Sequence, residues 1–96
     1  MQQQPEMKIN SYGTKRWYLN GKLHREGGPA TEWSDGLKEW WLNGQYHREG
    51  GPAIVLANGT KRWYLHGKEF SFEDYIIELE RLGLKDSIVN TLFNIG

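Results

Sequence analysis

Two copies of the triplet His-Arg-Glu carry the residue types that could do chemistry in this chain. The first copy is His24, Arg25 and Glu26, and the second, further along the chain, is His47, Arg48 and Glu49. An imidazole beside a carboxylate can act as a general base and acid, and two histidines can hold a zinc ion. Each triplet is therefore a candidate for acid–base catalysis or for metal binding.

The spacing of the triplets argues against both kinds of chemistry. Neighbouring strands lie ~4.8 Å apart, so equivalent residues two strands apart are separated by roughly 10 Å. Two imidazoles at that separation cannot share one zinc ion through bonds of about 2 Å, and two carboxylates lie at or beyond the widest spacing of an inverting glycosidase. Catalytic groups normally occur once, whereas residues that recur in every repeat hold the repeat together. We therefore expect the His, Arg and Glu side chains to bond across the corners that they form, and we expect no enzyme, metal or cofactor.

The triplets belong to a longer block that recurs at a constant interval. The block Trp-x-Leu-Asn-Gly-x-x-His-Arg-Glu-Gly-Gly-Pro-Ala occupies residues 17–30 and 40–53, and a shortened copy begins at Trp63. A short fixed period indicates stacked units, each of which needs its neighbours to bury its apolar side. Within the block, the Gly-Gly pairs at 27–28 and 50–51 predict unusual backbone angles, and Pro29 and Pro52 end the turn.

The elements that must position these blocks are short strands separated by tight turns. Asn-Gly and Asp-Gly pairs between apolar runs favour type I′ turns, in which both central residues have positive φ. The turn signals are Asn20-Gly21, Asp35-Gly36, Asn43-Gly44, Asn58-Gly59 and His66-Gly67. The aromatic and β-branched segments between them predict strands at Lys15–Leu19, Ala30–Ser34, Leu37–Leu42, Ala53–Ala57 and Lys61–Leu65. Met7–Ser11 is expected to add an N-terminal edge strand before a turn at Tyr12-Gly13.

After Phe70 the pattern changes to that of a helix. Ser71 and Asp74 resemble a capping box, apolar residues follow at helical spacing, and Gly83 stands where the helix should end. A second helix is expected from Asp86 to Asn94. The predicted fold is mainly β with C-terminal α: one domain with a disordered N-terminus (1–6), an antiparallel sheet of hairpin repeats in meander order (7–70) and a helical cap (71–96).

Each central strand divides its side chains between two faces. One face carries Trp17, Leu19, Trp40, Leu42, Trp63 and Leu65, and we expect these residues to form the core under the helices. The opposite face carries the aromatic stripe, which we define as Arg16, Tyr18, Glu39, Trp41, Arg62 and Tyr64. Two short helices cannot cover both faces, so the stripe is expected to be partly exposed. Exposed aromatic and arginine side chains are typical of protein-binding surfaces, but they can also stack on one another only to stiffen a sheet.

Composition restricts the other function classes. The chain has no cysteine and a formal net charge of zero, which disfavours a thiol site and a nucleic-acid partner. No apolar run approaches the ~20 residues needed to span a membrane, and the first residues do not resemble a signal peptide. We expect a cytoplasmic protein with neither a nucleic-acid nor a membrane partner.

The repeat unit, with Asn-Gly at its hairpin tip and a histidine after it, resembles the MORN-type repeat over residues 13–70. In that resemblance Tyr18, Trp41 and Tyr64 take the place of the MORN tryptophan, and the MORN His-Gly-x-Gly is replaced by His-Arg-Glu-Gly-Gly-Pro-Ala. This variant is similar to one present in small proteins of bacteriophages and large DNA viruses. The resemblance implies an elongated sheet that serves as a protein-interaction or scaffolding module.

Three functions are compatible with these patterns. The first is a non-enzymatic protein-interaction module, encoded by a phage, that inhibits a bacterial host or defence protein through the aromatic stripe. The second is a binder or sponge for a small ligand such as a nucleotide or a sugar. The third is a structural scaffold that forms a homodimer through the edge strand at residues 7–11.

Overall fold

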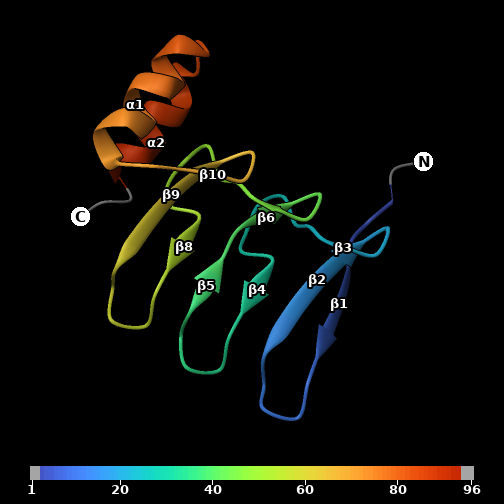
Figure 1. The fold of residues 1–96 in the computed structure, drawn as a ribbon. Helices are drawn as coiled ribbons and strands as arrows, with labels where there is room; N and C mark the ends of the chain where they lie inside the picture. Colours follow the sequence, from blue (N-terminus) through green and yellow to red (C-terminus); the bar gives the residue numbers. More distant parts are fainter. Residues whose placement is uncertain (1–2, 94–96) are drawn as a thin grey trace.

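A sheet of antiparallel hairpins followed by two C-terminal helices makes up the molecule, as the sequence predicts (Figure 1). The structure is a computed structural model that describes residues 3–93. Its strands are β1 (Glu6–Ile9), β2 (Lys15–Leu19), β3 (Lys22–Leu23), β4 (Thr31–Glu32), β5 (Lys38–Glu39), β6 (Trp41–Leu42), β7 (Gln45–Tyr46), β8 (Ile54–Val55), β9 (Lys61–Leu65) and β10 (Lys68–Phe70). Its helices are α1 (Phe72–Arg81) and α2 (Lys85–Phe93). Of the expected disordered segment 1–6, residues 1–2 lie outside the described residues and Glu6 already belongs to β1.

The strands follow one another across the sheet in the order β1-β2-β4-β5-β8-β9-β10, with β3 paired to β2. Every pairing is antiparallel. The predicted continuous strand Leu37–Leu42 is wrong, because it divides at Trp40 and its second half pairs only with β7 in a separate two-stranded sheet. Trp40 N–H donates to Ala53 O on one side (2.7 Å), while Trp40 O accepts from His47 N–H after the hairpin (3.1 Å). Trp17 makes the equivalent bonds in β2, but there β1 pairs along the strand and keeps it continuous.

Two kinds of turn alternate along the chain. Both central residues have positive φ at Asn20-Gly21, Asn43-Gly44 and His66-Gly67, as a type I′ turn requires. At Asp35-Gly36 and Asn58-Gly59 only the glycine has positive φ, so the predicted type I′ turns are wrong there. Those glycines instead close wider loops, in which Gly36 N–H donates to Trp33 O (3.0 Å) and Gly59 N–H donates to Leu56 O (2.9 Å).

The wider loop also occurs near the N-terminus, where the sequence block is hardest to see. Gly13 N–H donates to Asn10 O over 3.1 Å, in the geometry of the later two loops. Loop and hairpin therefore recur three times, and Figure 1 shows three long hairpins side by side with their loops along one edge. We call residues 7–29, 30–52 and 53–70 the first, second and third repeats.

Both helices form near their predicted positions. Ser71 caps α1 by accepting a hydrogen bond from Asp74 N–H (3.1 Å), and the chain leaves α1 at Gly83 with a φ of 75°. The second helix begins at Lys85 and is described to Phe93; its predicted last residue, Asn94, lies outside the described residues. No helix within residues 3–93 has the length and apolar character needed to cross a membrane.

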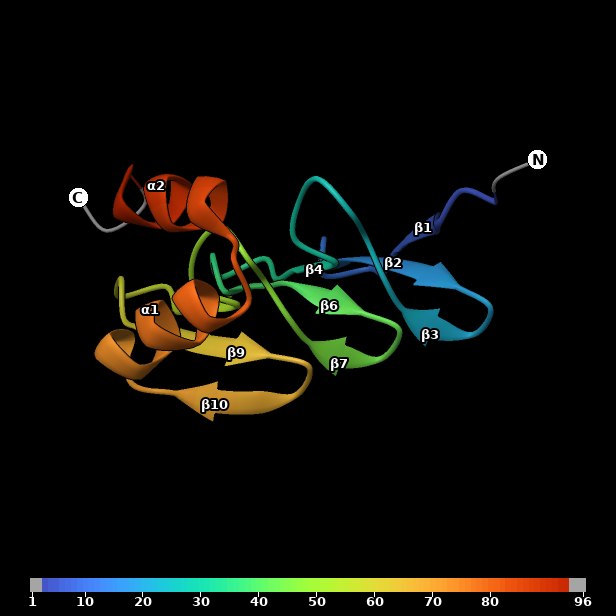
Figure 2. The same ribbon diagram turned by 90° about the horizontal axis from the view of Figure 1, so that it is seen from above.

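The helices cover only one end of the sheet. Figure 2 shows both of them at the end of the molecule that holds β9 and β10, with α1 beside β9, while β1, β2 and β3 at the other end stay uncovered. Trp63 and Leu65, 7 % and 4 % exposed, pack against Tyr75 and Leu79 of α1. The expected core is therefore confirmed in the third repeat only. In the first two repeats Trp17, Leu19, Trp40 and Leu42 are half-buried, because two helices are too short to reach along a molecule 39 Å across.

Candidate interaction surfaces

Each corner arginine lies flat on a tryptophan of its own repeat. The guanidinium carbon of Arg25 lies 3.9 Å from the ring centroid of Trp17, and that of Arg48 lies 3.9 Å from the ring centroid of Trp40. Each arginine also donates a hydrogen bond of 3.1 Å across its corner. Arg25 donates to the carbonyl of Pro29, and Arg48 donates to the carbonyl of Pro52. The prediction that arginine bonds across the corner is confirmed, and the two copies agree closely.

The Gly-Gly pairs have two different structural roles. Gly27 has a φ of 85°, but Gly28, Gly50 and Gly51 lack positive φ, so the predicted unusual angles are limited to one residue of the four. The second glycine of each pair makes room for arginine. A Cβ on Gly28 would lie 3.0 Å from the guanidinium carbon of Arg25, and the corresponding separation at Gly51 would be 2.8 Å.

Both histidines bond to the next repeat, and of the two only His47 also bonds within its own corner, so the expectation is wrong for His24. Asn43 N–H donates to Nδ1 of His24 (3.0 Å), and His66 N–H donates to Nδ1 of His47 (2.9 Å). Each donor belongs to the type I′ turn of the following repeat. The backbone strengthens the same junction, because Arg25 N–H donates to Trp41 O (3.1 Å). The histidines therefore join successive repeats.

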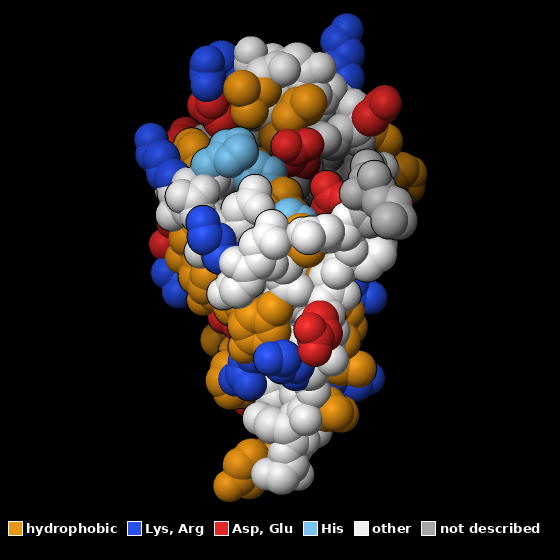
Figure 3. Space-filling view, turned by 90° about the vertical axis from the view of Figure 1, so that its right-hand side faces the viewer, with side chains coloured by type: hydrophobic (Ala, Val, Ile, Leu, Met, Phe, Trp, Pro, Cys, Tyr) orange, Lys and Arg blue, Asp and Glu red, His pale blue; other side chains and the backbone are white. Residues whose placement is uncertain are grey.

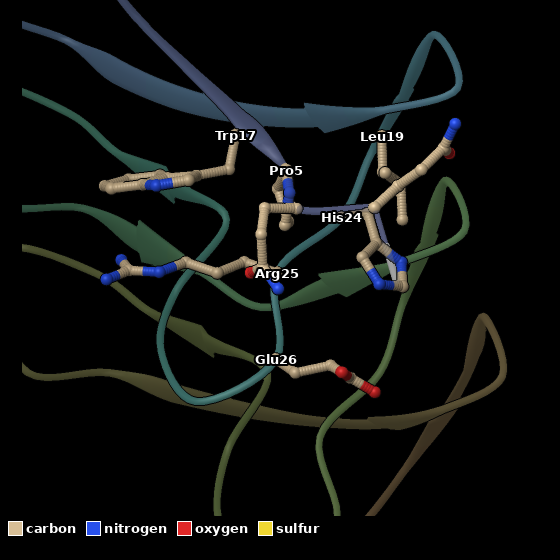
Figure 4. Close-up of a pocket in the computed structure, with 8 residues that line it drawn as sticks. Pro5, Trp17, Leu19, His24, Arg25 and Glu26 are labelled. Atoms are coloured by element: carbon tan, nitrogen blue, oxygen red, sulfur yellow. The ribbon is translucent and has the colours of Figure 1, made fainter. Parts of the chain in front are cut away.

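The two triplets differ at their glutamates. Nε2 of His47 lies 3.2 Å from a carboxylate oxygen of Glu49. Glu26 is exposed, and Figure 4 shows it apart from His24. The carboxylate near Arg25 is that of Glu32, at 3.6 Å. The expected glutamate bond across the corner is therefore present in the second triplet and absent from the described contacts of the first.

Burial lowers the pKa of His47, although the carboxylate of Glu49 acts in the opposite direction. The ring of His66 lies 4.3 Å from that of His47 and lowers the same pKa further. An enzyme would be expected to combine a perturbed histidine with an open cleft in one triplet. The larger cavity, however, borders His24 and not His47. Within residues 3–93, no cluster of three or more His, Asp or Glu side chains is arranged to hold a metal ion.

A cavity of about 640 Å³ lies at the uncovered end of the sheet. We call it the N-terminal cavity (Figure 4). Its lining consists of Gln3, Gln4, Pro5, Trp17, Leu19, His24, Arg25 and Glu26. Figure 3 looks onto this end of the molecule, where apolar, basic and acidic side chains are interspersed without one type dominating.

The equivalent space becomes smaller toward the helices. In the second repeat it measures about 290 Å³ and is bordered by Arg25, Glu26 and Gly27 of the preceding corner. In the third repeat the rings of Phe72 and Tyr75 lie 5.0 and 5.2 Å from that of Trp63, where an arginine lies in the earlier repeats. The N-terminal cavity is therefore bordered by no preceding corner and by neither helix.

The aromatic stripe is held by contacts with residues outside the predicted site. Glu39 accepts hydrogen bonds from Trp33 Nε1 (3.2 Å) and from the hydroxyl of Tyr46 (2.8 Å). The guanidinium carbon of Arg16 lies 4.8 Å from the ring centroid of Trp33. Burial, followed by the bond to Glu39, raises the pKa of Tyr46.

The remaining stripe residues also have partners inside the molecule. The ring of Tyr46 lies 4.0 Å from that of Trp41 and 5.0 Å from that of Tyr64. Tyr64 is only 9 % exposed, so the expectation of partial exposure is wrong at this position. Arg62 forms two hydrogen bonds of 2.8 Å with the carboxylate of Glu69.

Turn geometry could have identified these partners from the sequence. A two-residue turn at Asn43-Gly44 places Tyr46 opposite Trp41, and the one at His66-Gly67 places Glu69 opposite Tyr64. Trp33 has no such signal, because it lies in a wider loop where the sequence predicts a strand.

The geometry as a whole is that of a stiff sheet whose polar side chains mostly bond to the sheet itself. Arg16, Tyr18, Glu39 and Trp41 remain half-buried and Arg62 is exposed, so a partner can still reach the stripe at these residues. Comparison of the chain with protein-family models, with curated proteins and with solved structures gives no match.

Proposed function

We propose that this chain is a non-enzymatic protein-interaction module whose contact face is the aromatic stripe. The observation that carries the proposal is that the rings of Tyr18 and Trp41 and the two arginines of the stripe are accessible, and that neighbours also hold stripe side chains in place. Trp41 stacks on Tyr46, and Arg16 lies over Trp33. Side chains that are ordered before binding lose less conformational entropy when a partner arrives, which favours affinity.

The composition of the stripe supports a protein partner. Tryptophan, tyrosine and arginine are the residues enriched at the energetic centres of protein interfaces. The accessible stripe supplies all three types in Tyr18, Trp41 and Arg62, and Glu39 adds an acceptor. Tyr64 serves this surface from beneath, as a buried support for the ring of Tyr46.

The non-enzymatic part of the proposal rests on how the triplets are used. His24 and His47 accept backbone hydrogen bonds that join repeats, and Arg25 and Arg48 bind carbonyls of their own corners. Groups committed to these bonds are poor candidates for moving a proton to a substrate. The same contacts occur twice, as expected of residues that maintain a repeat.

The identity of the partner is proposed from the sequence resemblance. Type I′ turns begin at Asn20, Asn43 and His66, at a constant interval along the chain, and each is preceded by a strand. This recurrence supports a relationship to MORN-type repeats. On that basis we propose a phage-encoded inhibitor that acts in the host cytoplasm on a bacterial host or defence protein.

The test compares two double variants, each of which changes one basic residue and one tyrosine, on different surfaces. Arg16→Glu/Tyr18→Ala alters the stripe, and Lys15→Glu/Tyr12→Ala makes the matched change on the opposite face and in a loop. A partner recovered at constant stoichiometry from bacterial lysate should be purified and its Kd measured by calorimetry. We expect the stripe variant to weaken binding by about tenfold or more, as the loss of an interface centre does, and the control to bind normally. Equal binding by both variants, or no partner at all, would contradict the proposal.

A second candidate function rests on the N-terminal cavity. Its volume of about 640 Å³ lies within the range of small-molecule sites, and Trp17, His24 and Arg25 could recognise a nucleotide or a sugar. Native mass spectrometry of the freshly purified protein distinguishes this function. A reproducible bound mass that disappears in Trp17→Leu would support it, and a bare polypeptide mass with no ligand shift across nucleotide and sugar panels would argue against it.

A further inference from the structure

The outer edge of β1 carries backbone groups that the sheet leaves unpaired. β1 is the first strand of the sheet and pairs with β2 alone. No hydrogen bond to its outer edge is present within residues 3–93. All four β1 residues are exposed, including Met7 at 44 % and Ile9 at 58 %. An edge of this kind is a template for another strand.

The hydrogen bonds of β2 decide which groups of β1 face outward. Trp17 N–H donates to Ala30 O (2.8 Å), and Trp17 O accepts from His24 N–H (3.0 Å), so both groups point away from β1. Met7 lies opposite Trp17, which makes this a non-hydrogen-bonded pair. The backbone groups of Met7 therefore point to the free edge. Because directions alternate along a strand, those of Ile9 and the carbonyl of Pro5 do so as well.

We propose that a second copy of this chain pairs antiparallel with β1 through this edge, with Met7 opposite Met7 across a two-fold axis. Each copy then donates Met7 N–H to the Met7 carbonyl of its partner and Ile9 N–H to the Pro5 carbonyl of its partner. Pro5 lacks an N–H but contributes an acceptor here. Met7 and Ile9 lie on the face of Trp17, so the apolar surface of that face continues across the axis.

Charge selects this register from those that the backbone allows. The outward backbone groups of one copy must face the outward backbone groups of the other. Two registers then allow each copy to donate two hydrogen bonds: Met7 opposite Met7, or Met7 opposite Ile9. Met7 opposite Ile9 would place Lys8 directly against Lys8, which is unfavourable. Met7 opposite Met7 places Glu6 against Lys8 on both sides of the axis. The register with Met7 opposite Met7 therefore has two pairs of opposite charge, whereas the register with Met7 opposite Ile9 has one pair of like charge.

A second copy fits this edge better than an unrelated strand for the same reason. The segment Glu6-Met7-Lys8 is charge-complementary to itself when it is reversed, and an isologous dimer requires such self-complementarity. A two-fold pair uses the β1 edge of both copies, so pairing through β1 stops at a dimer and does not continue into a filament.

The test uses charge reversal and its rescue. The full chain is examined by sedimentation velocity from about 1 to 200 μM, a range that brackets weak dimers. Wild type should form a dimer in this range. Lys8→Glu and Glu6→Lys should each weaken dimerisation by about tenfold, because both make the facing pairs like-charged. The double variant Glu6→Lys/Lys8→Glu should restore it, and an equimolar mixture of the two single variants should form a heterodimer.

Ile9→Pro removes an outward N–H and should also abolish the dimer. The thermal midpoint of every variant controls for folding, and if Ile9→Pro fails to fold, the charge variants decide. A wild type that stays monomeric throughout the range would overturn the proposal. So would a Lys8→Glu variant that dimerises as tightly as wild type, or a double variant that is not rescued.

Discussion

At the residue scale, the repeated block is explained by contacts that need particular atoms. The second glycine of each pair leaves space for a guanidinium group, which then lies on a tryptophan and donates to a proline carbonyl. The sequence predicted a structural role for the triplets and a bond across the corner for arginine. It did not predict that Nδ1 of His24 and His47 would accept from the next repeat, because the donor is a backbone amide 19 residues away.

Gly51→Ala tests the close approach of the second corner. The new Cβ would lie 2.8 Å from the guanidinium carbon of Arg48 and would displace it from Trp40. We expect a loss of about 1–3 kcal/mol in the free energy of unfolding, as overpacking produces. Urea denaturation measures it. Gly50→Ala is the matched control, because its Cβ would make an ordinary contact at 3.4 Å with Asn90; a similar loss in both variants would show that space for Arg48 is not the cause.

At the element scale, the C-terminal helices replace a corner. Phe70 and Ser71 occupy the positions that histidine and arginine hold in the earlier blocks, and α1 begins at the next residue. The rings of Phe72 and Tyr75 then cover Trp63 in place of a guanidinium group. The helix boundaries could be predicted because capping is local. The division of the strand at Trp40 could not, because it depends on partners from two other segments.

Ser71→Ala tests how much the N-cap of α1 contributes. The variant loses the hydrogen bond from Asp74 N–H and leaves that amide without its side-chain acceptor. We expect the free energy of unfolding to fall by about 1 kcal/mol, while Ser71→Asp, which keeps an acceptor, should stay close to wild type. Chemical denaturation followed by circular dichroism compares the two. A Ser71→Asp variant as unstable as Ser71→Ala would indicate that the cap is not the relevant interaction.

At the scale of the whole molecule, α1 is joined to the second corner by one side chain. The buried hydroxyl of Tyr75 donates to the carbonyls of Arg48 and Gly51, which lie far back in the chain, and burial raises the pKa of Tyr75. The helical cap therefore contacts both the third repeat and the corner of the second. This contact links the stability of the cap to that of the sheet.

Tyr75→Phe tests that link. Removing the hydroxyl deprives two buried carbonyls of a donor, which should cost about 1–3 kcal/mol in the free energy of unfolding. Tyr12→Phe, at a position that is 81 % exposed, should have little effect. Hydrogen exchange should show faster exchange in the second corner as well as in α1. A change confined to α1 would mean that cap and corner are not energetically coupled.

The sequence by itself determined the period, the hairpin tips, the two helices and the arginine bonds across the corners, because each depends on a pattern of residues that can be read along the chain. Tertiary structure decided which repeat has a covered core, since α1 and α2 reach only Trp63 and its neighbours. It also decided that Tyr64 is buried while Tyr18 and Trp41 remain accessible, and that a cavity stays open beside Trp17. Identical residues in successive repeats differ in exposure because burial depends on what lies beside each repeat, and the two ends of a stack have different neighbours.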